Sequence, residues 1–217
     1  MDIIKTENGY LTVLTGKTDM GKSTITVYEC SENLKDGKKV LFFSYEYCQS
    51  IIYNKLISHF KVGWTQLFNL DIIDASGLRL EYLVDYVRSK KGNVDVIYID
   101  YLDLLKNATF APANDEAEDL AQIQEICKVL ASLSIELDIP IILLSQIGAS
   151  SSFEKSVERL NSFTEKAEAK NTIKMFIGKG NIINDRIDSS DIVHIILVDG
   201  YDLRHFSTIN IKEIYGD

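Results

Sequence analysis

Residues 16–23 read Gly-Lys-Thr-Asp-Met-Gly-Lys-Ser, a complete G-x-x-x-x-G-K-S motif, and this is the sharpest structural signal in the sequence. It follows a short apolar stretch, residues 10–14, that is typical of a strand, and it opens a helical pattern over residues 22–34. In this setting the motif predicts a P-loop, whose glycines let backbone N–H groups turn inward around phosphates at a helix N-terminus. The alternative is a chance glycine turn before a helix, which the motif and its context together disfavour.

The loop predicts a site for a nucleotide with Mg²⁺, and we expect Mg·ATP to bind. Lys22 can reach the β- and γ-phosphates, and the Ser23 hydroxyl can ligate the metal ion. The candidate nucleotide-binding residues are Gly16, Lys17, Thr18, Asp19, Met20, Gly21, Lys22 and Ser23.

Outward from the loop, apolar stretches alternate with helical patterns, which predicts an α/β fold with a mostly parallel sheet flanked by helices. An apolar stripe ending near Pro140 marks one long helix, and Asp199-Gly200 between two apolar runs predicts a C-terminal antiparallel hairpin. Further strands are expected at 40–44, 94–99, 141–144, 173–178, 192–198 and 205–211, further helices at 49–60 and 78–90, and polar segments at 106–115 and 148–171.

The composition limits which classes of function the chain can have. With 217 residues, 46% of them hydrophobic, and only two prolines, the chain is expected to form a single domain over residues 1–217. The net charge of −9 excludes a polycation that binds nucleic acid by bulk attraction. Three cysteines without a C-x-x-C motif argue against disulfides and structural zinc, and no apolar run is long enough to span a membrane. A cytoplasmic location is therefore expected.

Acidic and amide side chains follow the predicted strands. Asp100 comes directly after Ile97-Tyr98-Ile99 and is the candidate for a second magnesium ligand, whereas Asp103 is expected to cap a helix or face solvent. Glu46, after the strand at 40–44, is the candidate base for hydrolysis, with a surface glutamate as the alternative. Gln146 could sense the γ-phosphate or could merely satisfy buried backbone groups.

Four motifs in this order, GKTDMGKS, VLFFSYEY, VIYIDYLDLL and IILLSQI, together with DASGL at 74–78 and ELDIPIILLSQ at 136–146, resemble the RecA-type ATPase core of the DnaB family of replicative helicases. The resemblance covers most of residues 8–147. It implies a RecA-like P-loop ATPase that assembles as a hexameric ring around single-stranded DNA, with nucleotide held between subunits. It also implies that Lys22 and Ser23 hold phosphate and Mg²⁺, Glu46 is the catalytic glutamate, Asp100 is the Walker B acid, and Gln146 couples the γ-phosphate to the DNA loops.

The chain departs from the family pattern in several places. It begins at the core, without the family's N-terminal collar domain and with almost none of the linker helix, so ring assembly is not expected to be stable by itself. The family's Lys-x-Arg finger, which acts on the neighbouring subunit, is not recovered. One alignment places Ile196 and Val198 there, and another places Lys179 and Asn181. The arginine expected after the strand at 141–144 is also missing, because Gln146 is followed by Ile-Gly-Ala-Ser. The basic residues that could substitute for the finger are Lys179, Arg186 and Arg204.

By the same resemblance, the segments that face DNA are 106–118 and 148–171. In the second, lysine and arginine alternate with glutamate, so its charge is close to zero. Phe153 and Phe163 could stack on bases or pack beneath the segment.

The expected function is a DNA-dependent ATPase motor. Its expected location is the cytoplasm, or a host cytoplasm if the protein is viral, and a replication protein is expected as a further partner. The alternatives are a regulatory or recombinase-like ATPase and a nucleotide-binding assembly protein. Alone, the chain is expected to be mostly monomeric and a slow ATPase.

Overall fold

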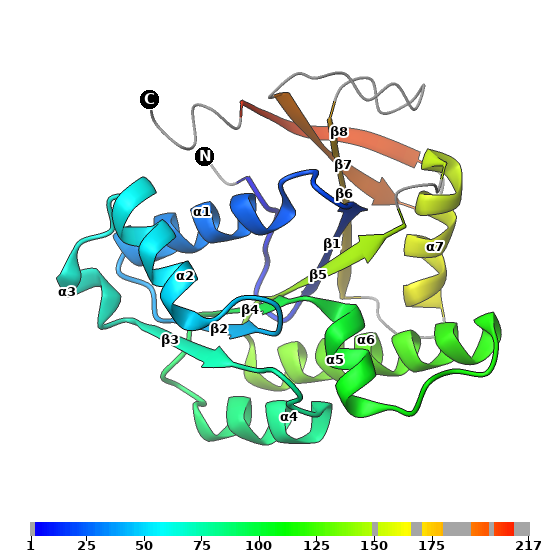
Figure 1. The fold of residues 1–217 in the computed structure, drawn as a ribbon, viewed down its shortest axis with the longest axis horizontal. Coiled ribbons are helices and arrows are strands. Elements are labelled where there is room, and N and C mark those ends of the chain that lie inside the picture. Colours follow the sequence, from blue (N-terminus) through cyan, green and yellow to red (C-terminus); the bar gives the residue numbers. More distant parts are fainter. Residues whose placement is uncertain (1–2, 149–151, 166–170, 180–191, 200–201, 211–217) are drawn as a thin grey trace.

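The computed structural model describes residues 3–148, 152–165, 171–179, 192–199 and 202–210, and these ranges form an eight-stranded sheet flanked by helices (Figure 1). The strand order is β3-β2-β4-β5-β1-β6-β7-β8; all neighbours through β6 are parallel, and β7 and β8 are antiparallel. The predicted fold class, a mostly parallel α/β sheet with a C-terminal antiparallel hairpin, is confirmed. The strands are β1 (Leu11–Lys17), β2 (Val40–Ser44), β3 (Leu70–Asp74), β4 (Val96–Asp100), β5 (Ile141–Ile147), β6 (Thr172–Lys179), β7 (Ile192–Asp199) and β8 (Asp202–Asn210).

Helices cover both faces of the sheet. They are α1 (Lys22–Lys35), α2 (Gln49–Asn54), the π-helix η1 (Lys55–His59), α3 (Trp64–Leu67), α4 (Leu80–Ser89), α5 (Leu102–Thr109), α6 (Glu116–Leu137) and α7 (Phe153–Glu165). Helices α1, α2 and η1 pack on one face in one hydrophobic cluster, and α4 to α7 pack on the other face in a second cluster. Strands β2, β4 and β5 are buried almost throughout because each of them is covered on both sides.

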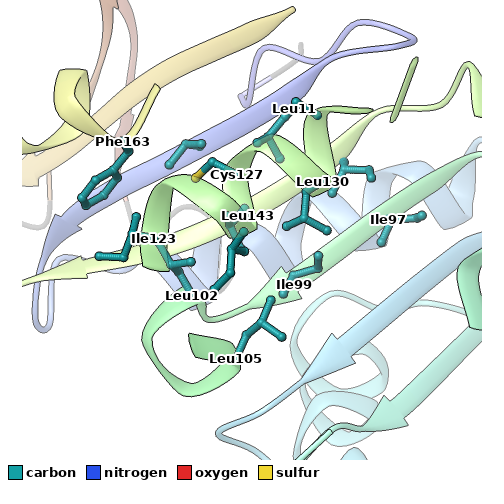
Figure 2. Packing of buried hydrophobic residues seen from close by; sticks show 14 of the residues in the cluster. Leu11, Ile97, Ile99, Leu102, Leu105, Ile123, Cys127, Leu130, Leu143 and Phe163 are labelled. Carbon is teal, nitrogen blue, oxygen red and sulfur yellow. The ribbon is translucent and has the colours of Figure 1, made fainter. Parts of the chain in front are cut away.

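Helix α6 shows how the sequence pattern produces this packing. Its predicted apolar stripe is buried at Ile123, Ile126, Leu130 and Leu133. Figure 2 shows Ile123 and Leu130, with Cys127 beside them, against Leu143 and Ile99 of the sheet. The Asp115 side chain accepts the backbone N–H of Glu118 and so caps the N-terminus. The helix ends at Leu137, earlier than Pro140, because Asp138 takes a left-handed conformation with φ 54°.

Several elements differ from the sequence-based expectation. The short edge strand β3 was not predicted, although its residues pair in register with β2 from Val40↔Leu70 to Ser44↔Asp74. The segment expected as a polar loop from residue 106 begins inside α5, and the segment 148–171 contains α7. Asp199 belongs to β7 and pairs with Asp202, while residues 200 and 201 of the predicted turn lie outside the described residues.

Candidate nucleotide-binding site

The P-loop connects the end of β1 to the start of α1. Gly21 has φ 86° and Asp19 has φ 61°, so the chain turns through two left-handed positions before the helix begins at Lys22. Gly16 is required for a different reason, because a Cβ at this position would lie 2.5 Å from the carbonyl oxygen of Ile177 on β6. Strand β1 can therefore carry the loop this close to β6 only with glycine at position 16.

The Lys22 side chain folds back over the loop that carries it. Its Nζ donates hydrogen bonds to the carbonyl oxygens of Gly16 at 2.9 Å and Lys17 at 2.7 Å. Burial lowers the pKa of Lys22 to about 8, and the nearby carboxylates of Asp100, Asp19 and Glu46 oppose this shift. Because an anionic group near Nζ would favour the charged form, the ammonium is well placed to pair with a phosphate.

Asp100 ends β4 beside the P-loop helix. Its side chain is 3% exposed, and burial raises the pKa of its carboxyl group to about 6, with the charge of Glu46 adding to the shift. A hydrogen bond from Ser23 and the charge of Lys22 act in the opposite direction. A hydroxyl and a carboxylate already in contact fit the oxygen ligands that Mg²⁺ prefers, with water and phosphate oxygens completing its shell. Ser23 and Asp100 would hold the ion.

Glu46 lies just beyond β2, which neighbours β4 in the sheet with Ser44 paired to Asp100. Its side chain is exposed and lines the same pocket as Lys22 and Asp100. The hydroxyl of Tyr47 hydrogen-bonds to this carboxylate, and burial together with the charge of Glu46 raises the pKa of Tyr47. An exposed carboxylate held at the mouth of the pocket is suited to meet a water molecule.

Lys55 and Tyr47 are pocket residues that sequence reasoning missed. The Nζ of Lys55 lies 5.0 Å from the centre of the Tyr47 ring, a cation–π distance, and both side chains line the pocket. Lys55 is the first residue of η1, one helical segment after Glu46. No sequence signal marks Lys55 as a pocket residue. It reaches the pocket because α2 continues as the π-helix η1, and the sequence does not show this change.

Gln146 reaches the P-loop from β5. The register pairs Gly16 with Gln146, and the side-chain Nε2 donates a hydrogen bond of 2.9 Å to the Thr18 hydroxyl. The amide thus bonds to a side chain of the P-loop and not to buried backbone groups. A bound nucleotide phosphate could compete with the Thr18 hydroxyl for this amide.

The structure brings most of the predicted residues together around one pocket of about 310 Å³. Met20 is an exception, because its side chain is 8% exposed and packs in the hydrophobic cluster beneath α1. Gly16 and Lys17 contribute backbone carbonyls to Lys22 and are not part of the lining. The lining residues are Thr18, Asp19, Gly21, Lys22, Ser23, Thr24, Glu46, Tyr47, Lys55, Asp100, Tyr101 and Gln146.

Asp103 does not cap α5, and it is only partly exposed to solvent. Its side chain is half-buried in the first turn of the helix, whose N-cap is Tyr101. One carboxylate oxygen accepts the backbone N–H of Gln146, and Oδ2 has no hydrogen-bond partner among the residues that the structure describes. Burial raises the pKa of Asp103, while Lys106 and Arg159 lower it.

The segments expected to face DNA are partly described. Phe153 and Phe163 are 4% and 1% exposed, and Phe153 packs edge-on against Phe176 at 5.1 Å, so both rings belong to the core and are not available to bases. Lys155, Glu158 and Arg159 lie exposed on α7. Residues 149–151 and 166–170, including Lys166 and Lys170, lie outside the described residues.

The positions considered for the finger are also partly described. Ile196 and Val198 are buried in β7, so an alignment that places the finger there puts it in the core. Arg204 is exposed on β8, Lys179 ends β6, and Arg186 lies outside the described residues.

Three further findings concern metals, thiols and membranes. Within the described ranges, no group of three or more His, Cys, Asp or Glu side chains is placed to hold a metal ion. Cys30, Cys48 and Cys127 are free thiols. None of the described helices is long and apolar enough to cross a bilayer.

Replacing Asp100 with asparagine is expected to stabilise the metal-free protein. Because burial raises the pKa of this acid from 3.8 to about 6, wild-type stability falls as the pH rises through this interval, and the loss is complete above it. Two pKa units correspond to about 3 kcal/mol, and the loss of a partner charge for Lys22 reduces the gain, so we expect about 1–3 kcal/mol at pH 7.5 and almost none at pH 4. Denaturant unfolding in EDTA measures the difference. A less stable Asp100→Asn protein at pH 7.5 would show that the partners of Asp100 outweigh the cost of burying its charge.

Comparison of the sequence with known proteins finds similarity to DnaB-like helicases. Residues 61–162 match the model for the DnaB-like helicase C terminal domain. Replicative DNA helicase DnaB of Pasteurella multocida (strain Pm70) is 27% identical over 219 residues, covering 86% of this chain and 46% of the relative. A probable plasmid replicative DNA helicase of Chlamydia psittaci is 27% identical over 166 residues, covering 64% of this chain and 35% of that protein. The chain therefore spans about half the length of the first of these relatives and about a third of the second.

Solved structures agree on the fold. One of them, described as an ATPase domain, superposes with a TM-score of 0.72 at 20% identity, covering 97% of this chain and 84% of that one. A DnaB-like replicative helicase, described with its interactions with primase, superposes with a TM-score of 0.69 at 21% identity, covering 94% of this chain and 55% of that one. The resemblance to the ATPase core of the DnaB family is confirmed, and the fold is RecA-like.

Proposed function

We propose that residues 1–217, which resemble the DnaB ATPase core, form one domain that hydrolyses Mg·ATP and acts on single-stranded DNA as a helicase motor. The observation that carries the proposal is the meeting of Lys22, Ser23, Asp100 and Glu46 at one pocket. Lys22 and Ser23 begin α1, Glu46 follows β2 and Asp100 ends β4. Together they offer a phosphate partner, two oxygen ligands for a metal ion, and a carboxylate for water.

The residues divide the chemistry between them. Mg²⁺, when bound, neutralises charge that develops on the phosphate oxygens. Lys22 would pair with the β- and γ-phosphates from its position over the loop, and Ser23 and Asp100 would orient the ion. Glu46 would take a proton from the attacking water while Tyr47 holds its carboxylate in place, a step typically worth ~10² to 10⁴ in rate.

Neighbouring copies are proposed to complete the site. The lining given by the described residues includes the cations Lys22 and Lys55 and no arginine. In P-loop enzymes an arginine finger contributes ~10³ to 10⁵ in turnover, so the isolated chain should hydrolyse ATP slowly. Arg204, Lys179 or Arg186 of an adjacent copy would supply the charge when the chains assemble as a homo-oligomer, with the hexamer as the form that the family resemblance implies.

Single-stranded DNA is proposed to bind along segments 106–118 and 148–171. The exposed side of α7 carries both Lys155 and Arg159, although Glu158 lies between them and the whole chain has a net charge of −9. Contacts must therefore be local, through these cations and through backbone N–H groups. A cytoplasmic location and a replication protein as a further partner complete the proposal.

ATP turnover with and without single-stranded DNA, measured across protein concentration, tests this function. We expect a low rate for the chain alone, and a rate per chain that rises cooperatively with protein concentration when DNA is present. The control is duplex DNA of the same sequence. Fast turnover by a stable assembly without DNA would contradict the motor proposal.

A regulatory or recombinase-like ATPase is the second candidate, and the acidic net charge and the mixed charges of α7 favour it. Its nucleotide state would control assembly with a protein partner. Turnover that is indifferent to single-stranded DNA at every concentration would select this function over the motor.

A further inference from the structure

Asp19 is the third carboxylate at the nucleotide pocket. It lies in the turn of the P-loop between β1 and α1, three residues before Lys22, and its exposed side chain lines the pocket. The proposed chemistry assigns a task to the other two acids, since Asp100 would hold the metal ion and Glu46 would act on water. It leaves Asp19 without a task, although this residue belongs to the loop that would surround the phosphates.

The three carboxylates differ in their contacts. Asp100 accepts a hydrogen bond from Ser23, and Glu46 accepts one from the Tyr47 hydroxyl. Within the part of the chain that the structure describes, the Asp19 carboxylate takes part in no hydrogen bond and no ion pair. Asp19 is therefore the acid of this pocket whose oxygens are open to an incoming ligand.

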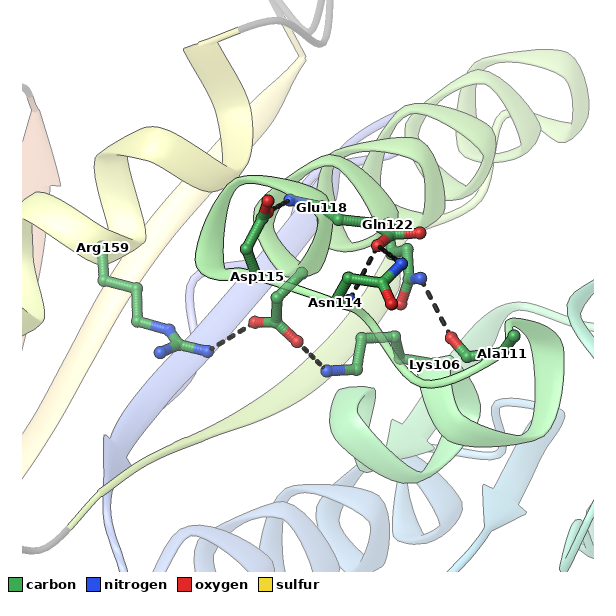
Figure 3. Close-up of polar contacts among 8 residues, drawn as sticks. Lys106, Ala111, Asn114, Asp115, Glu118, Gln122 and Arg159 are labelled. Atoms are coloured by element: carbon green, nitrogen blue, oxygen red, sulfur yellow. Dashed lines mark hydrogen bonds and ion pairs between the residues drawn. The ribbon is translucent and has the colours of Figure 1, made fainter.

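An acid that ties elements of this protein together has matched partners. Asp119 of α6 forms ion pairs with Lys106 of α5 and with Arg159 of α7, the latter at 3.4 Å (Figure 3). Two cations offset the charge of this one carboxylate. Asp19 shows no such pairing among the described residues, so a purely structural role does not account for its charge.

The backbone at Asp19 permits an acid but does not require one. Its φ is 61°, in the left-handed region, where asparagine and aspartate are tolerated better than most residues with a side chain and glycine is unstrained. Asparagine or glycine would therefore serve the turn as well, without the charge. The conformation explains a small polar residue at this position, and the negative charge needs a separate reason.

The charge balance of the pocket supplies that reason. The described lining contains the cations Lys22 and Lys55 and the acids Asp19, Glu46 and Asp100, so the acids outnumber the cations before a nucleotide enters. An exposed carboxylate about 6 Å from a phosphate weakens binding ~3- to 10-fold for each unit of negative charge on the ligand. Mg·ADP has a net charge of about −1 and metal-free ADP about −3, so the repulsion is larger when the metal ion is missing.

We propose that Asp19 is a specificity-determining residue whose charge makes the pocket select metal-bound nucleotide and release the diphosphate product quickly. The inference rests on the proposed nucleotide site. Asp19 takes no part in bond making, and it acts through the repulsion between its carboxylate and the phosphate oxygens. Removal of this side chain from the pocket should therefore strengthen nucleotide binding, in contrast to the loss of binding expected when Lys22 is removed.

The nucleotide affinity of the full chain tests the proposal. We would measure the dissociation constants of Mg·ADP, and of ADP in EDTA, for the wild type, Asp19→Asn and Asp19→Gly at pH 7, where most of Lys22 is charged. Both variants should bind Mg·ADP ~3- to 10-fold more tightly and should gain more for metal-free ADP. Dissociation of Mg·ADP, followed with a fluorescent analogue, should slow by about the factor by which the affinity rises.

Controls separate charge repulsion from a change in loop structure. Asp36→Asn makes the same chemical change at the exposed C-cap of α1, at the opposite end of that helix from the P-loop, and should leave both affinities unchanged. Raising the salt concentration should reduce the gain in Asp19→Asn, because exposed charges are screened, whereas a gain from loop structure would persist. Agreement between Asp19→Asn and Asp19→Gly excludes a new hydrogen bond from the asparagine amide as the cause.

The outcomes separate this inference from the proposed function. Tighter binding by both variants, with the larger gain for metal-free ADP and a gain that shrinks in salt, supports the assignment. A wild type that binds Mg·ADP as tightly as both variants overturns the inference and leaves the nucleotide site in place, and so does an equal gain with and without Mg²⁺. If the wild type binds neither Mg·ADP nor Mg·ATP at millimolar concentration, the proposed site itself is wrong and the inference falls with it.

Discussion

Substituting Lys22 with alanine is expected to lower ATP turnover by ~10² to 10³ or more and to weaken Mg·ATP binding. The ammonium is held over the loop by the carbonyl oxygens of Gly16 and Lys17, so its charge lies where phosphate oxygens would gather. The variant removes this charge and the two hydrogen bonds that it makes to the loop carbonyl groups. Calorimetric titration with Mg·ATP and a steady-state ATPase assay measure the two effects.

The lowered pKa of Lys22 gives the binding experiment a second signal. With a pKa of about 8, a substantial fraction of Lys22 is neutral at pH 8, and an incoming phosphate raises the pKa and draws a proton from the buffer. Titrations at pH 8 in buffers of different ionisation enthalpy should therefore show proton uptake by the wild type and less uptake by Lys22→Ala. At pH 6 the lysine is already charged, so its contribution to uptake should vanish.

Lys35→Ala provides the matched control, because Lys35 is exposed on the same helix and forms an ion pair with Glu32. It should bind and hydrolyse ATP as the wild type does. A Lys22→Ala protein that binds and hydrolyses ATP at the wild-type rate would remove this pocket as the nucleotide site.

The main features of the site could be predicted because they depend on short-range sequence signals. A G-x-x-x-x-G-K-S stretch between a strand and a helix is typical of the P-loop conformation. Parallel strands bring their carboxyl ends to one edge of the sheet. Asp100 and Gln146 therefore lie beside the P-loop, as their positions after apolar strands predict. Their roles in binding and catalysis stay predictions.

The features that were missed depend on tertiary contacts. Strand β3 is five residues long and has charged residues at positions 71 and 74, so its sequence resembles a loop until it pairs with β2. Asp103 looks like a surface cap in the sequence, and the packing of α5 against β5 leaves it half-buried. Lys55 enters the pocket through the path of η1, which no periodicity in the sequence specifies.

Glu46→Gln is expected to separate binding from chemistry. The side chain is exposed at the mouth of the pocket, and the hydrogen bonds of Lys22 and Ser23 go to other groups, so the variant should bind Mg·ATP with nearly wild-type affinity. Glutamine has the same shape but cannot accept a proton from water. Turnover should therefore fall by ~10² or more, the scale of general base catalysis.

A single-turnover assay at saturating Mg·ATP, together with a binding titration, measures the two quantities separately. Glu125→Gln, at an exposed position on α6, makes the same chemical change away from the pocket and should be neutral. Tyr47→Phe removes the hydrogen bond to Glu46 while leaving the carboxylate, so its rate should lie between those of the wild type and Glu46→Gln. This order follows only if Glu46 acts on water and Tyr47 orients it. Unchanged turnover in Glu46→Gln would require another carboxylate at the pocket to serve as the base, and Asp19 would then be the residue to substitute next, because it also lines the pocket.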